Sequence, residues 1–124
     1  MPIAKPLFSI LKLTHSGSSI IADLDINTDS EIFPGHFPGH PVVPGACMLQ
    51  LVKDVLEATL NKTLRLKKAG QLKFISMIDP NVVQTVQLDI TYATNEEIEV
   101  TAKLISQGAA CFKLQGVFLF DHIS

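Results

Sequence analysis

The chain has 124 residues, enough for one domain with a buried core, and 47% of them are hydrophobic. Its mean hydropathy of +0.31 is high for this length, so we expect a partner subunit to cover part of the apolar surface. A formal net charge of −2, without a basic cluster among aromatic residues, argues against a nucleic-acid partner. No apolar run approaches a signal peptide or a membrane span, so we expect a cytoplasmic protein.

Two strands are predicted at the beginning of the chain. The first starts at about Leu7, and the Ser-Gly-Ser sequence of residues 16–18 forms the turn after it. In the second strand, apolar positions recur with the two-residue period of a half-buried strand. These positions are Ile20, Ala22, Leu24 and Ile26.

Residues 33–50, FPGHFPGHPVVPGACMLQ, begin as a loop rich in proline and glycine. Prolines fix the backbone, and glycines let it approach a ligand closely. Because the loop also carries His36 and His40, it is suited to position a titratable side chain. We therefore predict a functional site where this loop runs into the helix that begins at Gly45.

The helix is predicted from Gly45 to about Asn61, a plausible stop residue. Its polar residues fall at spacings of three and four and form a narrow stripe. They are Gln50, Lys53, Asp54 and Glu57. Aliphatic residues occupy the remaining faces, so this helix must be buried on nearly all sides.

Four further strands are predicted after the helix. The first covers residues 64–78, with a bulge or bend at residues 67–70, and a turn at residues 79–81 follows it. The others cover residues 82–92, 98–104 and 112–120, and turns at Asn95-Glu96 and Gln107-Gly108 separate them. Two strands, one apolar helix and four strands joined by short turns predict a single α+β domain, residues 1–124, with an antiparallel sheet.

The GHFPGHPVVPG run resembles the signature of the β-hydroxyacyl-acyl-carrier-protein dehydratases of type II fatty acid synthesis. The positions that match are Phe33, Gly35, His36, Phe37, Pro38, Pro41, Val42, Pro44 and Gly45. A second stretch, Lys73-Phe74 followed by Pro80, is similar to another part of the family sequence. The resemblance implies the hotdog fold, in which a curved antiparallel sheet wraps around one long central helix. It also implies a homodimer or a higher homo-oligomer whose sites form between subunits.

The resemblance implies a role for three residues at the loop and the helix. His36 stands at the family's catalytic histidine and would take the proton beside the thioester carbonyl. The N–H of Gly45, at the positive end of the helix dipole, would stabilise the enolate-like oxygen. Gln50 stands where the family has a catalytic Glu or Asp, and an amide cannot release a proton at neutral pH.

The acyl chain is expected to contact residues of the loop and of the helix. These residues are Phe33, Phe37, Pro41, Val42, Val43 and Asp54. Asp54 lies one turn after Gln50 and is the alternative source of a carboxyl group. His40 matches a variable position of the family, so we expect it to lie at the surface or to pack in the loop.

Three functions remain open. The favoured one is a hydro-lyase that converts 3-hydroxyacyl thioesters, carried by acyl carrier protein or another thiol, to the trans-2-enoyl form. The second is a non-catalytic subunit that binds an acyl chain or pairs with an active homologue. The third is an acyl thioesterase, which would need Asp54 or Glu57 to activate water. Fold alone does not decide among them.

Cys47 and Cys111 have apolar neighbours and no CxxC spacing, so we predict two buried free thiols in a reducing compartment. No histidine, cysteine or carboxylate spacing is typical of a metal site. We therefore expect neither a metal nor an organic cofactor.

Overall fold

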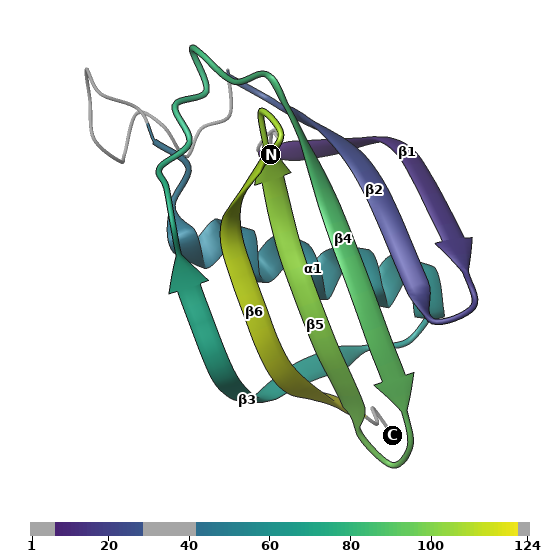
Figure 1. Cartoon of the computed structure of the whole chain (residues 1–124). Helices are drawn as coiled ribbons and strands as arrows, with labels where there is room; N and C mark the ends of the chain where they lie inside the picture. Colours follow the sequence, from purple (N-terminus) through teal and green to yellow (C-terminus); the bar gives the residue numbers. More distant parts are fainter. Residues whose placement is uncertain (1–6, 29–41, 122–124) are drawn as a thin grey trace, which may run out of the picture.

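The computed structural model describes residues 7–28 and 42–121. These residues form six strands and one helix in the predicted order of two strands, the helix and four strands (Figure 1). The elements are β1 (Phe8–Ser16), β2 (Ser19–Ile26), α1 (Gly45–Leu60), β3 (Leu64–Phe74), β4 (Thr85–Thr94), β5 (Ile98–Ser106) and β6 (Ala109–Phe120). The described helix is not long and apolar enough to cross a membrane.

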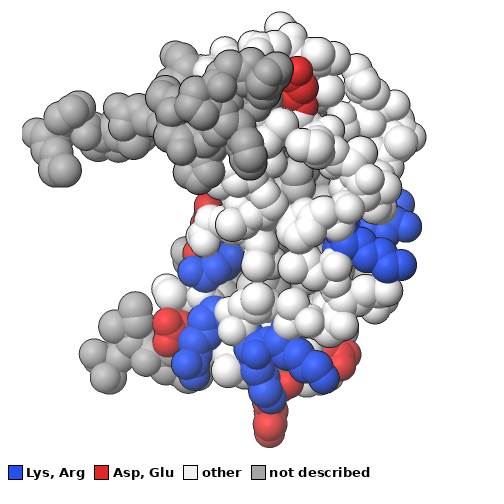
Figure 2. All heavy atoms as spheres, turned by 90° about the vertical axis from the view of Figure 1, so that its left-hand side faces the viewer, with Lys and Arg blue, Asp and Glu red and all other residues white. Residues whose placement is uncertain are grey.

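The six strands form one antiparallel sheet in the order β1-β2-β4-β5-β6-β3, and α1 lies across its inner face (Figure 1). The expected hairpins β4–β5 and β5–β6 are present. The expectation that β3 and β4 are adjacent strands is wrong. Residues 75–84 carry the chain across the sheet, and β3 pairs with β6 instead. As a result, β3 forms one edge of the sheet, which faces the viewer in Figure 2.

The helix has the predicted bounds. Pro44 caps it with an extended backbone (φ −64°, ψ 142°), and Asn61 ends it in the left-handed conformation (φ 53°), with its N–H bonded to the Glu57 carbonyl. The face toward the sheet is buried and consists of Met48, Leu51, Val52, Val55 and Leu56. A helix covered by one curved sheet is the arrangement that the family resemblance implies.

The alternating pattern of the strands is confirmed in the core. The four apolar positions of β2 are at most 3% exposed, and those of β5, from Ile98 to Leu104, are equally buried. In β6 the side chains of Phe112, Leu114 and Phe118 are at most 1% exposed. The inner face of the sheet and the buried face of α1 therefore form one hydrophobic core.

The bounds of β3 and β4 differ from the predicted ones, and β5 ends later and β6 begins earlier than predicted. β3 ends at Phe74 rather than at residue 78, and its two register shifts, at Leu66/Lys68 and Ala69/Gln71, are the expected bulges. Val82 precedes β4 and is 67% exposed. It belongs to a turn closed by the Asp79 carbonyl, which accepts the N–H groups of Val82 and Val83 at 3.0 and 2.9 Å.

Candidate active site

Only part of the predicted site lies within the described residues. Gly45, Gln50 and Asp54 are on α1, and Val42 and Val43 immediately precede it. The remaining predicted site residues, and His40 with them, are outside the described residues. They are Phe33, His36, Phe37 and Pro41. The geometry that follows therefore concerns the helix side of the site.

The first turn of α1 presents backbone N–H groups that have no acceptor within residues 7–28 and 42–121. The N–H groups of Cys47 and Met48 bond to the Pro44 carbonyl at 3.0 and 3.4 Å. Among the described residues, no acceptor faces the N–H groups of Gly45 and Ala46. The first turn also has no acidic side chain and no side-chain cap. These N–H groups, at the positive end of the helix dipole, can stabilise a negatively charged oxygen.

Phe74, at the end of β3, covers this helix start. A Cβ atom added to Gly45 would lie 2.5 Å from Phe74 Cε1 and 2.7 Å from Cζ, so only glycine allows the ring to rest there. The ring also contacts Phe112, with centroids 5.4 Å apart. From the sequence alone, Phe74 is interpreted as a structural strand residue. Its position over the helix start could be suspected only from the glycine at position 45, which leaves room for the ring.

Gln50 and Asp54 form a hydrogen-bonded pair on the polar stripe of the helix. The Gln50 Nε2 group donates to Asp54 Oδ1 at 2.8 Å, and both residues are exposed in the single chain. Their spacing of four residues places them on one face of α1. Because the amide nitrogen is bonded to Asp54, the amide carbonyl oxygen remains available to accept a hydrogen bond from a ligand.

The same pair lines a hollow of about 310 Å³ between α1 and the start of β1. Its described lining residues are Leu7, Phe8, Ile10, Leu24, Cys47, Gln50, Leu51, Asp54 and Val55. Apart from the thiol, Gln50 and Asp54 supply the polar side chains of this lining. A small apolar hollow with few polar groups is typical of a site that binds an apolar chain and orients one polar group of it.

The two valines before the helix differ in exposure. Val43 is 4% exposed, and its N–H bonds to the Ile78 carbonyl at 2.9 Å. Val42 is half-buried. Val43 therefore packs in the core and fixes the approach to Pro44, and neither valine lines the hollow between α1 and β1.

Both cysteines are free, as expected. Cys111 is buried, and its thiol donates to the Leu104 carbonyl at 3.3 Å. The expectation of burial is wrong for Cys47, which is half-buried because it lines the hollow. Burial raises the pKa of both thiols, so neither is an activated nucleophile. Within residues 7–28 and 42–121, no group of histidine, cysteine or carboxylate side chains is placed to hold a metal ion.

Comparisons with known proteins agree on one family. The family model of ApeI-like dehydratases matches residues 12–113. The curated relatives include 3-hydroxyacyl-[acyl-carrier-protein] dehydratases of the FabZ type. That of Haemophilus influenzae is 35% identical over 63 residues, 51% of this chain and 42% of the relative. That of Oenococcus oeni is 29% identical over 83 residues, 61% of this chain and 58% of the relative. The matches thus span about half the length of these relatives.

Solved structures agree on the fold. A chain of the dehydratase heterocomplex ApeI:P from Xenorhabdus doucetiae matches with a TM-score of 0.73 and 17% identity. This match covers 93% of this chain and 98% of that one. A thioesterase superfamily protein from Shewanella loihica matches with a TM-score of 0.59 and 15% identity, over 90% of this chain and 91% of that one. The curved sheet around one helix is therefore the hotdog fold.

Proposed function

Because the chain belongs to the family of ApeI-like dehydratases, we propose that it removes water from 3-hydroxyacyl thioesters and forms the trans-2-enoyl thioester. The observation that carries this proposal is the first half of α1. There, N–H groups without an acceptor among the described residues and the Gln50–Asp54 pair lie on one helix, and the pair lines an apolar hollow. The substrate carrier in this proposal is acyl carrier protein, by analogy with the relatives of the FabZ type.

The N–H groups of the first helical turn would bind the thioester carbonyl oxygen. Removal of the α-proton places negative charge on this oxygen, and Gly45 and Ala46 offer donors at the positive end of the dipole. Phe74 lies against Gly45 and would shield one side of the reacting carbonyl from water. Gly45 would thus have two roles: its N–H donates a hydrogen bond, and its missing side chain leaves room for the Phe74 ring.

The base in the proposed reaction is His36, whose assignment rests on the sequence motif. Its neutral imidazole would take the α-proton as the C–H bond breaks, and the double bond would form as the hydroxide leaves the β-carbon. The proton on His36 would then join the hydroxide, so that water leaves and the imidazole returns to its neutral form. This sequence balances without another acid.

The Gln50–Asp54 pair would hold the leaving hydroxyl. The Gln50 carbonyl oxygen can accept a hydrogen bond from the substrate hydroxyl, while Asp54 fixes the amide by accepting the 2.8 Å hydrogen bond from Nε2. Without a general acid at position 50, the reaction is expected to be about a hundred- to ten-thousandfold slower on an ordinary saturated chain. We therefore expect the preferred substrate to carry a hydroxyl that leaves easily, next to an unsaturated or aromatic group.

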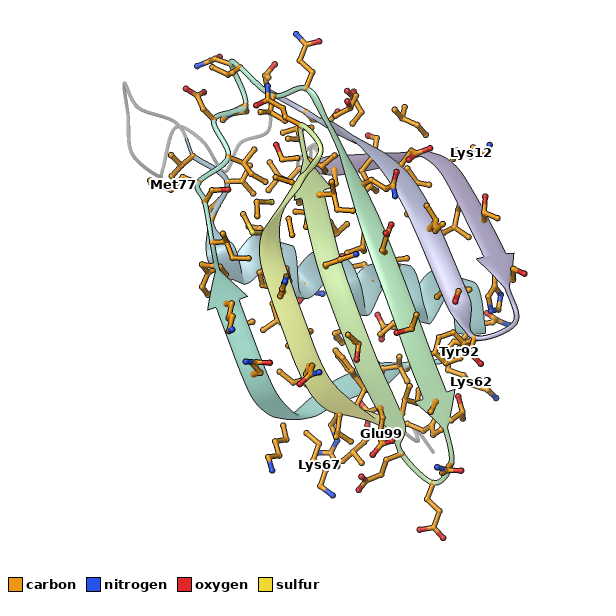
Figure 3. The ribbon with its side chains drawn as sticks, viewed as in Figure 1. Lys12, Lys62, Lys67, Met77, Tyr92 and Glu99 are labelled. Atoms are coloured by element: carbon orange, nitrogen blue, oxygen red, sulfur yellow. The ribbon has the colours of Figure 1, made fainter. Side chains whose placement is uncertain are left out.

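The proposed active form is a homodimer joined along the edge strand β3. From Arg65 to Phe74, every residue of β3 except Leu66 is exposed, and an unpaired edge of this length is a template for another strand. Large apolar side chains gather near its end: Leu72, Phe74, Ile75 and Met77 are 39%, 55%, 53% and 76% exposed. Met77 lies at the margin of the molecule beyond the end of β3 (Figure 3). A second copy on this edge would cover the helix start as well.

A non-catalytic subunit is the second candidate function. The missing carboxyl at Gln50 favours it, and one structural match is a chain of a dehydratase heterocomplex. In that case the hollow beside α1 would bind an acyl chain, and an active homologue would supply the chemistry.

The test is incubation with acyl carrier proteins loaded with saturated and unsaturated 3-hydroxyacyl chains, followed by mass spectrometry of the intact carrier. Loss of one water, without release of the acyl group, is the result expected for a dehydratase. Release of the free acid would identify a thioesterase instead. Binding of the acyl carrier without either change would favour the non-catalytic subunit.

A further inference from the structure

The hollow between α1 and β1 has a buried floor and an exposed rim. Three buried side chains form the floor: Leu24, Leu51 and Val55 are 0%, 6% and 1% exposed. The rim includes Gln50 and Asp54, which are exposed, and Ile10 of β1, which is 48% exposed. Among the described residues, the hollow is therefore open between Ile10 and the polar pair, above an apolar floor that a hydrocarbon chain can cover.

The hollow extends away from the helix start. On the helix side it runs from Cys47, two residues after Gly45, to Val55. This separation of eight residues corresponds to about 12 Å along the helix axis. On the strand side the hollow runs from Leu7 to Ile10, and in Figure 1 the first half of β1 and α1 run in the same direction. Ile10 therefore lies at the end of the hollow that is far from the helix start.

The size of the hollow determines the length of chain that fills it. A cavity of about 150 Å³ binds benzene, and the hollow, at about 310 Å³, has room for about twelve carbon atoms. A substrate whose hydroxyl is bound by Gln50 would have five helix residues, or about 7.5 Å, between that point and Val55. This distance corresponds to about six carbon–carbon bonds of an extended chain. An acyl chain of about nine to twelve carbons therefore reaches the far end of the hollow.

We propose that the hollow binds the tail of the acyl chain and that Ile10 is a specificity-determining residue, which favours chains of about nine carbons or more over shorter ones. This inference rests on the proposed function, which binds the substrate hydroxyl at Gln50. A chain of about six carbons would end before Ile10 and leave much of the apolar floor in contact with water. Each further methylene group that is buried strengthens binding by about fourfold, until the tail has passed Ile10.

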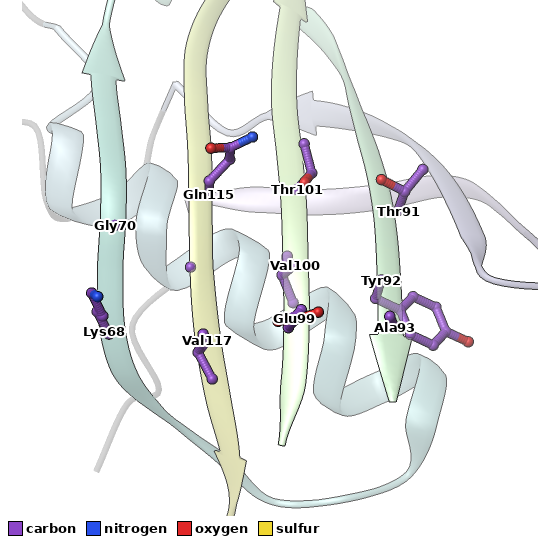
Figure 4. A pocket seen from close by; sticks show the side chains of 11 residues that line it. Lys68, Gly70, Thr91, Tyr92, Ala93, Glu99, Val100, Thr101, Gln115 and Val117 are labelled. Carbon is purple, nitrogen blue, oxygen red and sulfur yellow. The ribbon is translucent and has the colours of Figure 1, made fainter. Parts of the chain in front are cut away.

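A larger hollow on the outer face of the sheet is unsuited to this tail. It measures about 560 Å³, and its lining includes Thr91, Thr101 and Gln115 together with the charged residues Lys68 and Glu99 (Figure 4). An apolar chain would deprive these polar groups of water without offering them hydrogen bonds. The sheet also separates this hollow from α1, which lies behind the strands in Figure 4. A tail bound there could not be continuous with a thioester at the helix start.

Ile10 lies on the edge of the sheet that the proposed dimer leaves free. β1 and β3 are the two edge strands, and the proposed contact with a second copy runs along β3. The next residue, Leu11, is 59% exposed but lines a separate hollow on the outer side of the sheet, with Asp23 and Gln87. Leu11 is therefore a matched control for Ile10, because it is a neighbouring, exposed, apolar residue that does not line the hollow beside α1.

The test compares Ile10→Ser with Leu11→Ser on acyl carrier protein loaded with 3-hydroxy-4-hexenoyl or 3-hydroxy-4-dodecenoyl chains. Both chains carry a double bond next to the hydroxyl, and they differ only in the length of the tail. In the wild type we expect kcat/KM to be at least about tenfold higher for the longer chain. Ile10→Ser should reduce this preference to about threefold or less, and Leu11→Ser should leave it unchanged. Thermal unfolding checks that both variants are folded.

Protection of Cys47 from alkylation provides a second readout, which does not require turnover. Cys47 lines the hollow, whereas Cys111 is 1% exposed and serves as the internal reference. We expect decanoyl-N-acetylcysteamine to slow the alkylation of Cys47 by iodoacetamide at least about fivefold, because the bound chain covers the thiol. Butanoyl-N-acetylcysteamine should have little effect, and Ile10→Ser should weaken the protection by the decanoyl thioester.

The two readouts separate this inference from the proposed function. If the wild type dehydrates neither substrate while the decanoyl thioester alone protects Cys47, the proposed function is wrong and the tail site stands. If the wild type dehydrates both chains equally and neither thioester protects Cys47, the tail site is overturned and the proposed function stands. An unchanged preference in Ile10→Ser, or an equal loss of preference in Leu11→Ser, would overturn the role of Ile10.

Discussion

Polar side chains have different surroundings on the two sides of the sheet. On the inner side, Gln50 and Asp54 face an apolar hollow and are bonded to each other at 2.8 Å. On the outer side, Lys73, Lys103 and Lys113 are opposite one another without an ion pair among the described residues. A hydrogen-bonded pair beside an apolar hollow can hold one defined geometry, as a reaction requires. The three lysines of the outer side are exposed to water and have no fixed ionic partner among the described residues. The comparison separates a candidate reaction site from a solvated polar face in one small domain.

The largest expected effect is that of His36→Ala, which removes the proposed base. We expect dehydration to be abolished, with a fall of at least about a thousandfold, because the proposed reaction assigns the α-proton to His36 alone. The matched control is His40→Ala in the same loop, which should be close to neutral. Rates of water loss measured by mass spectrometry give the answer. Similar behaviour of the two variants would show that the roles of the two histidines are assigned wrongly.

Gly45→Ala should disturb the candidate active site and lower the rate less than His36→Ala does. The new methyl group would lie 2.5 Å from the Phe74 ring, so the ring or the helix start must move. We expect a fall of about a hundredfold in kcat, the usual effect of misplacing one oxyanion donor. Thermal unfolding checks that the fold survives. Adding Phe74→Ala should relieve the clash and restore the lost stability without restoring the rate, since water then enters. Full activity of Gly45→Ala would exclude the proposed role of this helix turn.

The edge strand β3 carries side chains of both faces of the sheet. The proposed dimer contact along this strand can be weakened without changing either face. Ile75→Asp/Met77→Asp places two charges in the exposed apolar group beyond β3. We expect the wild type to sediment as a dimer at micromolar concentration and this variant to dissociate at a concentration at least about tenfold higher. A matched pair on the exposed side of the first two strands, Leu11→Asp/Ile21→Asp, should leave the dimer intact. A wild type that sediments as a monomer would contradict the proposed assembly.

The sequence predicts most of the fold because its signals are local. Alternation in β2, β5 and β6, the Asn61 stop and the Gln107-Gly108 turn, with φ values of 52° and 81°, need only neighbouring residues. The place of β3 beside β6 depends on how residues 75–84 cross the sheet, which no local pattern encodes. For the same reason Phe74 is missed as the cover of Gly45, since the two residues are distant in the sequence. The alignment of Lys73, Lys103 and Lys113 on the outer face likewise depends on the strand register.

The most direct measurement is the rate of water loss from a saturated 3-hydroxyacyl carrier substrate for the wild type, Gln50→Glu and Asp54→Asn. A glutamate at position 50 is nearly isosteric with Gln50 and would place a carboxyl group beside Asp54, on the face of α1 that lines the hollow. This carboxyl group could serve as the missing general acid for a substrate bound there. We expect Gln50→Glu to be about tenfold faster than the wild type or more.

Asp54→Asn serves as the control, because it keeps the size of the side chain and removes its charge. In our account this variant loses only the fixed orientation of Gln50 and slows the reaction by about tenfold or less. The opposite result, an inactive Asp54→Asn with no gain in Gln50→Glu, would contradict the account and identify Asp54 itself as the acid.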